Sequence, residues 1–156
     1  MQNKIAAFVK NNYTKTVWFF VIFYCVGIIG MIVPATFPLF VKLIPFALLL
    51  SVLALVLFHG EFSNRTLFVF LFIFLFGFIA EVFGVNTGFV FGNYNYGNGL
   101  GIKLFNTPLM IGINWLLLVY LTASLTEKLK ANPFSKVVLA SVIMLVYDVV
   151  LEQVAP

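Results

Sequence analysis

Five long apolar segments, separated by short polar ones, dominate the pattern of hydrophobic and polar positions along the chain. They cover about residues 17–33, 40–58, 66–83, 109–125 and 136–154. A helix of roughly 20 apolar residues crosses the hydrocarbon core of a bilayer, and these segments lack the period-two alternation of an outer-membrane strand. The pattern therefore predicts an all-α, polytopic membrane protein with about five transmembrane helices.

The longest interruption in this pattern, residues 84–108, is rich in glycine, asparagine and tyrosine. Glycine and asparagine adopt left-handed backbone angles readily, and tyrosine suits the membrane interface. We expect an outer loop between the third and fourth helices, folded as a lid or a re-entrant segment. Because the sequence shows no internal repeat, we expect one membrane domain over residues 1–156.

Composition and charge support this class and indicate an orientation. Apolar residues make up 63% of the chain and charged residues 9%, far from the averages of about half and a quarter in soluble domains. The net charge of +4 does not suggest a nucleic-acid partner, because basic residues in membrane proteins mostly mark cytoplasmic loops. Seven basic residues fall on one predicted side and two on the other: Lys4, Lys10, Lys15, Arg65, Lys128, Lys130 and Lys136 against Lys42 and Lys103. We therefore expect a cell-membrane protein with a cytoplasmic amino terminus.

Three carboxylates lie within the predicted spans, where an ionisable group is costly and usually functional. At 1.5 Å per residue from the cytoplasmic edge, Glu81 lies about 22 Å up, Asp148 about 18 Å and Glu152 about 24 Å. Asp148 and Glu152 are four residues apart and so share a helix face. Asn114 and Trp115 reach the same level from the outer side. The spacing predicts one polar layer in the outer part of the membrane.

The outer loop is expected to cover this layer with Thr87, Tyr94 and Tyr96. Clustered carboxylates in a low dielectric cannot all ionise, so we expect one to retain a proton beside an ionised neighbour, as a general acid and base require. A purely structural alternative is that the carboxylates share a proton and hold the helices together. With His59 and Cys25 as the sole residues of their types, no metal site is expected.

One series of residues resembles a known family. It reads Glu81-x-x-Gly84-x-x-Thr87-Gly88-x-x-Phe91-Gly92-x-Tyr94-x-Tyr96, then Leu100-Gly101, Pro108, Ile111, Asn114-Trp115 and Asp148-x-x-x-Glu152-x-Val154-Ala155. Over about residues 81–155 this series is similar to the membrane carotenoid biosynthesis protein family, which includes carotenoid hydratases. Residues 1–80 contribute hydropathy alone. Members of that family continue through further helices, so we expect this chain to lack carboxy-terminal helices that relatives possess.

The resemblance implies a reaction and a set of site residues. The reaction is the addition of water to the terminal carbon–carbon double bond of an acyclic or monocyclic carotenoid, which requires no cofactor. The implied partners are a membrane-embedded carotenoid, the lipid bilayer and other enzymes of the pathway. The expected catalytic residues are Glu81, Asp148 and Glu152, and the expected substrate-binding residues are Thr87, Tyr94, Tyr96, Asn114 and Trp115.

Three other functions fit the same residues. Cyclisation of a carotenoid end group begins with the same protonation but excludes water. A proton-coupled transporter could relay protons along the carboxylates, although the missing inverted repeat argues against it. A scaffold could bind a carotenoid or partner enzymes without chemistry. Analysis of the products separates these alternatives.

Overall fold

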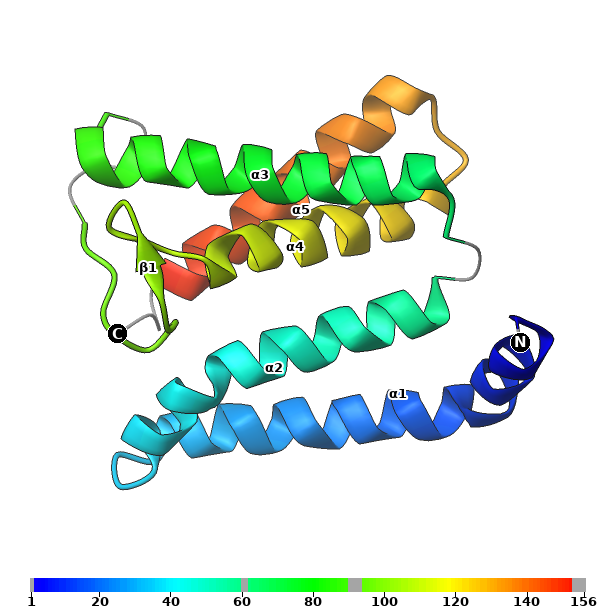
Figure 1. The fold of residues 1–156 in the computed structure, drawn as a ribbon, viewed down its shortest axis with the longest axis horizontal. Coiled ribbons are helices and arrows are strands. Elements are labelled where there is room, and N and C mark those ends of the chain that lie inside the picture. The colour runs from blue at the N-terminus through cyan, green and yellow to red at the C-terminus, as the bar shows by residue number, and fades with distance from the viewer. Residues whose placement is uncertain (1, 60–61, 90–93, 153–156) are drawn as a thin grey trace.

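The computed structural model describes residues 2–59, 62–89 and 94–152, with side chains from residue 11 to residue 149 of these ranges (Figure 1). The described part contains five helices and one short β-hairpin, and it confirms the predicted all-α class. The elements are α1 (Gln2–Ile32), α2 (Phe37–Phe58), α3 (Asn64–Thr87), β1 (Lys103–Leu104), β2 (Thr107–Pro108), α4 (Met110–Glu127) and α5 (Pro133–Glu152).

Four stretches within these helices are long and apolar enough to cross a membrane. They are Asn11–Ile32 in α1, Phe37–Phe58, Asn64–Thr87 and Met110–Glu127. The chain is therefore a multi-pass membrane protein. The fifth predicted helix also forms, as α5, and its crossing stays a prediction because its last side chains lie outside the described residues.

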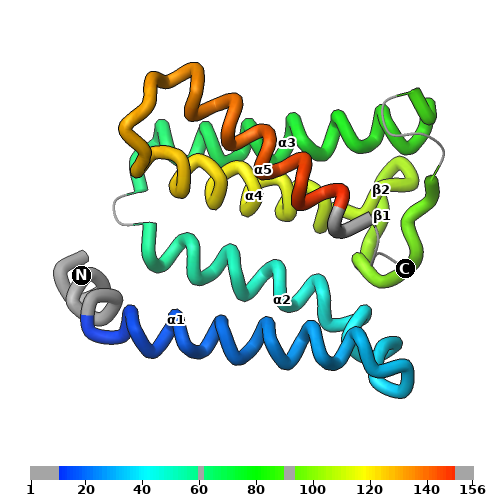
Figure 2. The backbone as a smooth tube through the Cα atoms, turned by 180° about the vertical axis from the view of Figure 1, so that it is seen from behind, coloured from blue at the N-terminus to red at the C-terminus, as the bar shows by residue number. Residues whose placement is uncertain are grey.

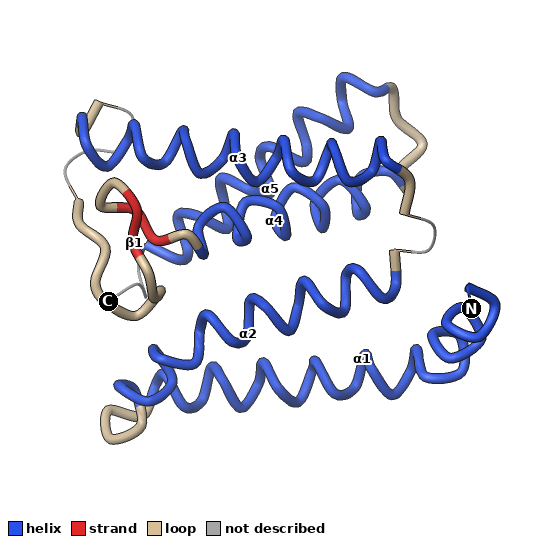
Figure 3. Tube along the Cα trace, in the orientation of Figure 1, coloured by secondary structure: helices blue, strands red, loops and turns tan. Residues whose placement is uncertain are grey.

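The helices run up and down in succession and form two groups (Figures 1 and 2). α1 and α2 pack as a helical hairpin, and α2 contacts α4, which also contacts α3 and α5. The turns gather at two ends, as Figure 3 shows. One end of the molecule carries the α1–α2 turn, the β-hairpin of β1 and β2, and the last turn of α5. We call it the hairpin end, after the β-hairpin. The opposite end carries the α2–α3 connection and the α4–α5 turn. We call it the basic end, because Arg65, Lys128 and Lys130 lie there.

Two glycines allow α3 and α4 to approach closely. A Cβ atom added to Gly77 of α3 would collide with the ring of Trp115 on α4. A Cβ atom added to Gly112 of α4 would lie 2.7 Å from Cε2 of Phe74 on α3. Small residues at helix contacts in membranes increase van der Waals packing. Each helix thus receives an aromatic ring from its partner.

Hydrogen bonds between side chains join the other helices. The hydroxyl of Tyr24 on α1 lies 2.6 Å from Oγ of Ser51 on α2. At the basic end, Nδ1 of His59 lies 3.0 Å from the hydroxyl of Tyr120 on α4. Polar contacts of this kind hold neighbouring membrane helices in register.

Capping residues set the length of α3, and the helix they define is longer than predicted. Ser63 precedes the helix, and its Oγ accepts a hydrogen bond of 3.1 Å from the backbone N–H of Thr66. At the other end Gly88 adopts the left-handed conformation, with φ of 65°, and its N–H bonds to the carbonyl of Gly84. The helix therefore continues to Thr87, and the prediction that the loop starts at Gly84 was wrong because left-handed Gly88 stops the helix.

Candidate functional site

A buried carboxylate marks the hairpin end of α3. The Glu81 side chain is 7% exposed, and it shares its face of the helix with Gly77, Phe78 and Gly84. These are the buried residues of α3, so Glu81 points into the bundle and not toward lipid. A carboxylate at such a position needs hydrogen-bond partners, because burial of an unpaired polar group costs free energy.

Two tyrosine hydroxyls supply those partners. Tyr94 and Tyr96 both donate a hydrogen bond to the same oxygen, Oε1 of Glu81. Their rings are edge to face, with centroids 5.3 Å apart. Within the described residues the second oxygen, Oε2, has no hydrogen-bond partner. The structure thus brings together three of the predicted site residues, and the described tyrosines bond to one of the two carboxyl oxygens.

The environment of Tyr96 keeps this side chain a neutral donor. Burial raises the pKa of the Tyr96 hydroxyl, and the hydrogen bond to Glu81 raises that pKa further. Its backbone is held as well, because Nζ of Lys103 on β1 donates a 2.5 Å hydrogen bond to the carbonyl of Tyr96. The loop therefore presents a fixed O–H group to the carboxylate.

The β-hairpin attaches this loop to α3. Its turn places Phe105 and Asn106 at positive φ, 51° and 64°, as a two-residue hairpin turn of the type I′ class requires. Asn86 of α3 donates through Nδ2 to the carbonyls of Val82 (2.7 Å) and Phe105 (3.0 Å). Its Oδ1 accepts a 2.9 Å bond from Nδ2 of Asn106. Thr107 follows, fully buried.

Sequence reasoning missed the role of Asn86, Asn106 and Thr107 in positioning the loop. A signal was present, because the run Asn106-Thr107-Pro108 before a helix is typical of a turn. Its partner Asn86 lies 20 residues earlier in the chain, and no local pattern links the two.

Trp115 and Asn114 lie in the second turn of α4, and the structure relates Trp115 to the face of α3 that carries Glu81. Trp115 packs on Gly77, which lies one helical turn before Glu81 on the same face of α3. Asn114 is half-buried. Because the hydrogen bonds to Glu81 from the described residues come from the tyrosines, Asn114 is not a direct partner of the carboxylate.

The structure does not bring Thr87 into the cluster. Its side chain is exposed at the end of α3, where Oγ1 donates a 2.7 Å bond to the carbonyl of Phe83. The same oxygen accepts a 3.2 Å bond from the N–H of Phe89. Thr87 was predicted to cover the polar layer with the tyrosines, but it turns to another face because six residues along a helix do not return to the same face.

The structure describes the two carboxylates of α5 to different extents. α5 and α3 both end at the hairpin end (Figure 2), and Glu81 belongs to the last two turns of α3. Asp148 is exposed, and the Glu152 side chain lies outside the described residues. Among the described residues, no group of three His, Cys, Asp or Glu side chains could hold a metal ion.

The fold and this cluster define a multi-pass helical membrane protein with a buried carboxylate–tyrosine site at one end of its bundle. The chain belongs to the carotenoid biosynthesis protein family, whose family model matches residues 43–155. The match includes Glu81, both tyrosines and the α4 residues beside them. No curated protein and no solved structure matches the chain.

Proposed function

We propose that the protein adds water to the terminal carbon–carbon double bond of an acyclic or monocyclic carotenoid, with Glu81 as the acid. The observation that carries the proposal is the arrangement of the Glu81 carboxyl group. Oε1 accepts hydrogen bonds from Tyr94 and Tyr96, and none of the described residues donates a hydrogen bond to Oε2. Family membership supplies the class of substrate.

In the proposed mechanism Oε2 of Glu81 carries a proton and transfers it to the less substituted carbon of the terminal double bond. A new carbon–hydrogen bond forms with the π electrons, and the adjacent carbon becomes a tertiary cation. A water oxygen then attacks that carbon and releases a proton, which restores the acid. The product is a tertiary alcohol, and the net change is the addition of one water.

The surrounding residues would stabilise the charges that develop. As Glu81 loses its proton, the O–H groups of Tyr94 and Tyr96 strengthen their hydrogen bonds to Oε1. The ring of Trp115 on α4 packs against Gly77, one turn before Glu81 on α3, and can stabilise a cation through its quadrupole. Asp148 and Glu152 are the candidate bases that hold the water, with Asn114 orienting it.

The depth of the site suits a substrate dissolved in the membrane. The polyene would lie in the bilayer with its end group at the hairpin end. We also propose that the basic end faces the cytoplasm, because Arg65, Lys128, Lys130 and Lys136 gather there. In that orientation the site lies in the outer part of the cell membrane, where other enzymes of the pathway could share its substrate.

Expression in a lycopene-producing bacterium tests the proposal. The wild-type chain should yield a carotenoid heavier by one water, and Glu81→Gln should abolish that product because the amide cannot donate a proton to the alkene. Glu127→Gln is the matched control, since Glu127 is exposed and pairs with Lys136 at the basic end. Pigments are compared by chromatography and mass spectrometry at equal membrane levels of protein. An isomer of unchanged mass would instead assign cyclisation, and equal hydration in both variants would refute the role of Glu81.

A further inference from the structure

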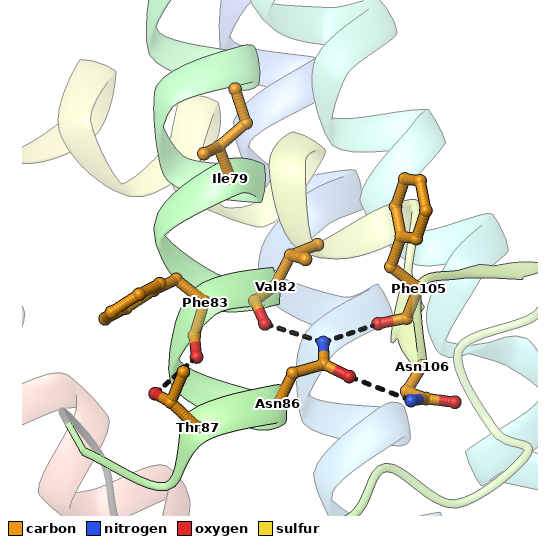
Figure 4. Close-up of a pocket in the computed structure, with 7 residues that line it drawn as sticks. All are labelled: Ile79, Val82, Phe83, Asn86, Thr87, Phe105 and Asn106. Carbon is orange, nitrogen blue, oxygen red and sulfur yellow. Dashed lines mark hydrogen bonds between the residues drawn. The ribbon is translucent and has the colours of Figure 1, made fainter.

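A groove of about 460 Å³ lies on the face of α3 opposite Glu81, between the end of that helix and the β-hairpin turn. Ligand sites typically occupy about 300–1,000 Å³. The residues that line the groove are Ile79, Val82, Phe83, Asn86, Thr87, Phe105 and Asn106 (Figure 4).

Helix geometry separates the groove from the Glu81 site. Residues 79, 82, 83 and 86 follow the i, i+3, i+4, i+7 spacing of one helix face, while Gly77, Glu81 and Gly84 follow the same spacing on the other. Exposure agrees, because Ile79 is 62% exposed and Glu81 7%. The groove is therefore not an entrance to the carboxylate.

The walls of the groove are apolar. Ile79 and Val82 form the α3 side, and the ring of Phe105 extends from the hairpin turn alongside the helix (Figure 4). The backbone of Phe105 has a φ of 51°, a left-handed conformation that a bulky residue rarely adopts. Its carbonyl is fixed by Asn86. The fold thus keeps an aromatic ring beside the helix where a glycine would fit the backbone more easily.

The polar side chains beside the groove are neutral. Asn86 uses both N–H groups and its carbonyl oxygen to hold the hairpin. Asn106 donates once to Asn86, and within the described residues its own amide oxygen has no partner. None of the described residues that line the groove carries a charge. A phosphate headgroup would require a cation, whereas an amide suits a hydroxyl group.

From these features we infer that the groove binds the hydroxyl-bearing end of a neutral isoprenoid chain. The chain would lie between Phe105 and the α3 side of the groove, and its hydroxyl would bond to the Asn106 amide. The inference rests on the family assignment and on the groove, and not on the acid chemistry proposed for Glu81. It also gives Thr87 a place in ligand binding away from the carboxylate.

Photolabelling in phosphatidylcholine vesicles tests this site. Two probes share one photoreactive chain: an isoprenoid alcohol such as a modified geranylgeraniol, and the same hydrocarbon without the hydroxyl. In the wild-type protein the alcohol should label the groove residues at least about fivefold more than the hydrocarbon, as expected for one hydrogen bond. Mass spectrometry of peptides locates the label.

Two variants and a control make the result specific. Ile79→Trp fills the groove and should remove the label, whereas Leu71→Trp, at a similarly exposed position of α3 outside the groove, should keep it. Asn106→Gly tolerates the positive φ and should abolish the preference for the alcohol. Glu81→Gln should label as the wild type does, which separates this inference from the proposed reaction.

Three results would overturn the inference. Equal labelling by the two probes would remove the hydroxyl recognition. Equal labelling of Ile79→Trp and Leu71→Trp would show that the groove is not the binding place. Loss of the label in excess anionic phospholipid would assign the groove to ordinary membrane lipid.

Discussion

At the scale of single residues, depth along a helix could be predicted from the sequence but direction around the helix could not. Counting residues placed Glu81 in the outer layer, the outer loop was expected to cover that layer with Tyr94 and Tyr96, and the structure brings these three residues into contact. The same counting placed Asp148 near that level, and Thr87 was expected in the covering loop, yet both side chains are exposed. Height follows from a fixed rise per residue, whereas the face that is buried depends on which helix packs there.

Removal of the tyrosine hydroxyls should slow the proposed reaction. Both donate to Oε1 of Glu81, so Tyr94→Phe and Tyr96→Phe should each lower kcat about tenfold, and the double variant about a hundredfold or more. Rates of water addition by the purified protein in vesicles provide the measurement. Tyr120→Phe is the control, because that hydroxyl pairs with His59 at the basic end. An unchanged rate in a folded double variant would contradict the role of the tyrosines.

The raised pKa of Tyr96 predicts a loss of stability in alkali. The folded state holds the Tyr96 proton more tightly than the unfolded state, so its stabilisation is fully present below the unfolded pKa of about 10. As pH rises above that value, unfolding releases a proton and the free energy of unfolding falls. Denaturation in detergent should show this decrease in the wild type and a smaller one in Tyr96→Phe. Parallel curves above pH 10 would exclude Tyr96 as the titrating group.

At the scale of elements, the number of helices followed from the hydropathy pattern, and the helix contacts did not. All five predicted helices form; α3 is a few residues longer than predicted because Ser63 and Gly88 cap it, and α1 begins at Gln2, well before the apolar segment predicted from residue 17. The β-hairpin was not predicted, since each of its strands has two residues. Asn86 holds the turn by side-chain bonds, and such long-range bonds leave no periodic signal.

Enlarging Gly112 should separate α3 from α4. Gly112→Leu would drive a side chain into the Phe74 ring and should lower the free energy of unfolding by about 1–3 kcal/mol, the usual cost of overpacking. Gly27→Leu on α1 is the matched control, because a Cβ atom there meets no neighbour within 4 Å. Denaturation of both variants in detergent measures the difference, and equal stability would argue against close packing at Gly112.

At the scale of the whole molecule, the alternation of the turns between two ends was predictable, because short connections force successive helices to run antiparallel. The structure places Lys42 and Lys103 at the hairpin end and Arg65, Lys128, Lys130 and Lys136 at or near the basic end. The family match begins at residue 43 and so extends the resemblance recognised over residues 81–155 back into α2.

Cysteine labelling from outside the cell should reveal the proposed orientation. With Cys25 replaced by alanine, Asn98→Cys at the hairpin end should react with a membrane-impermeant reagent. Asn132→Cys at the basic end should react after the membrane is opened, because we propose that this end is cytoplasmic. The reverse pattern would invert the topology and place the Glu81 site in the inner part of the membrane.

Incorporation of oxygen from water tests the central claim most directly. Purified protein in vesicles is given lycopene in water labelled with heavy oxygen, and the carotenoid product is analysed by mass spectrometry. We predict that the wild type forms an alcohol carrying the heavy oxygen and that Glu81→Gln forms none. Equal incorporation by the two proteins, or a product without the label, would contradict the account of Glu81 as the acid for water addition.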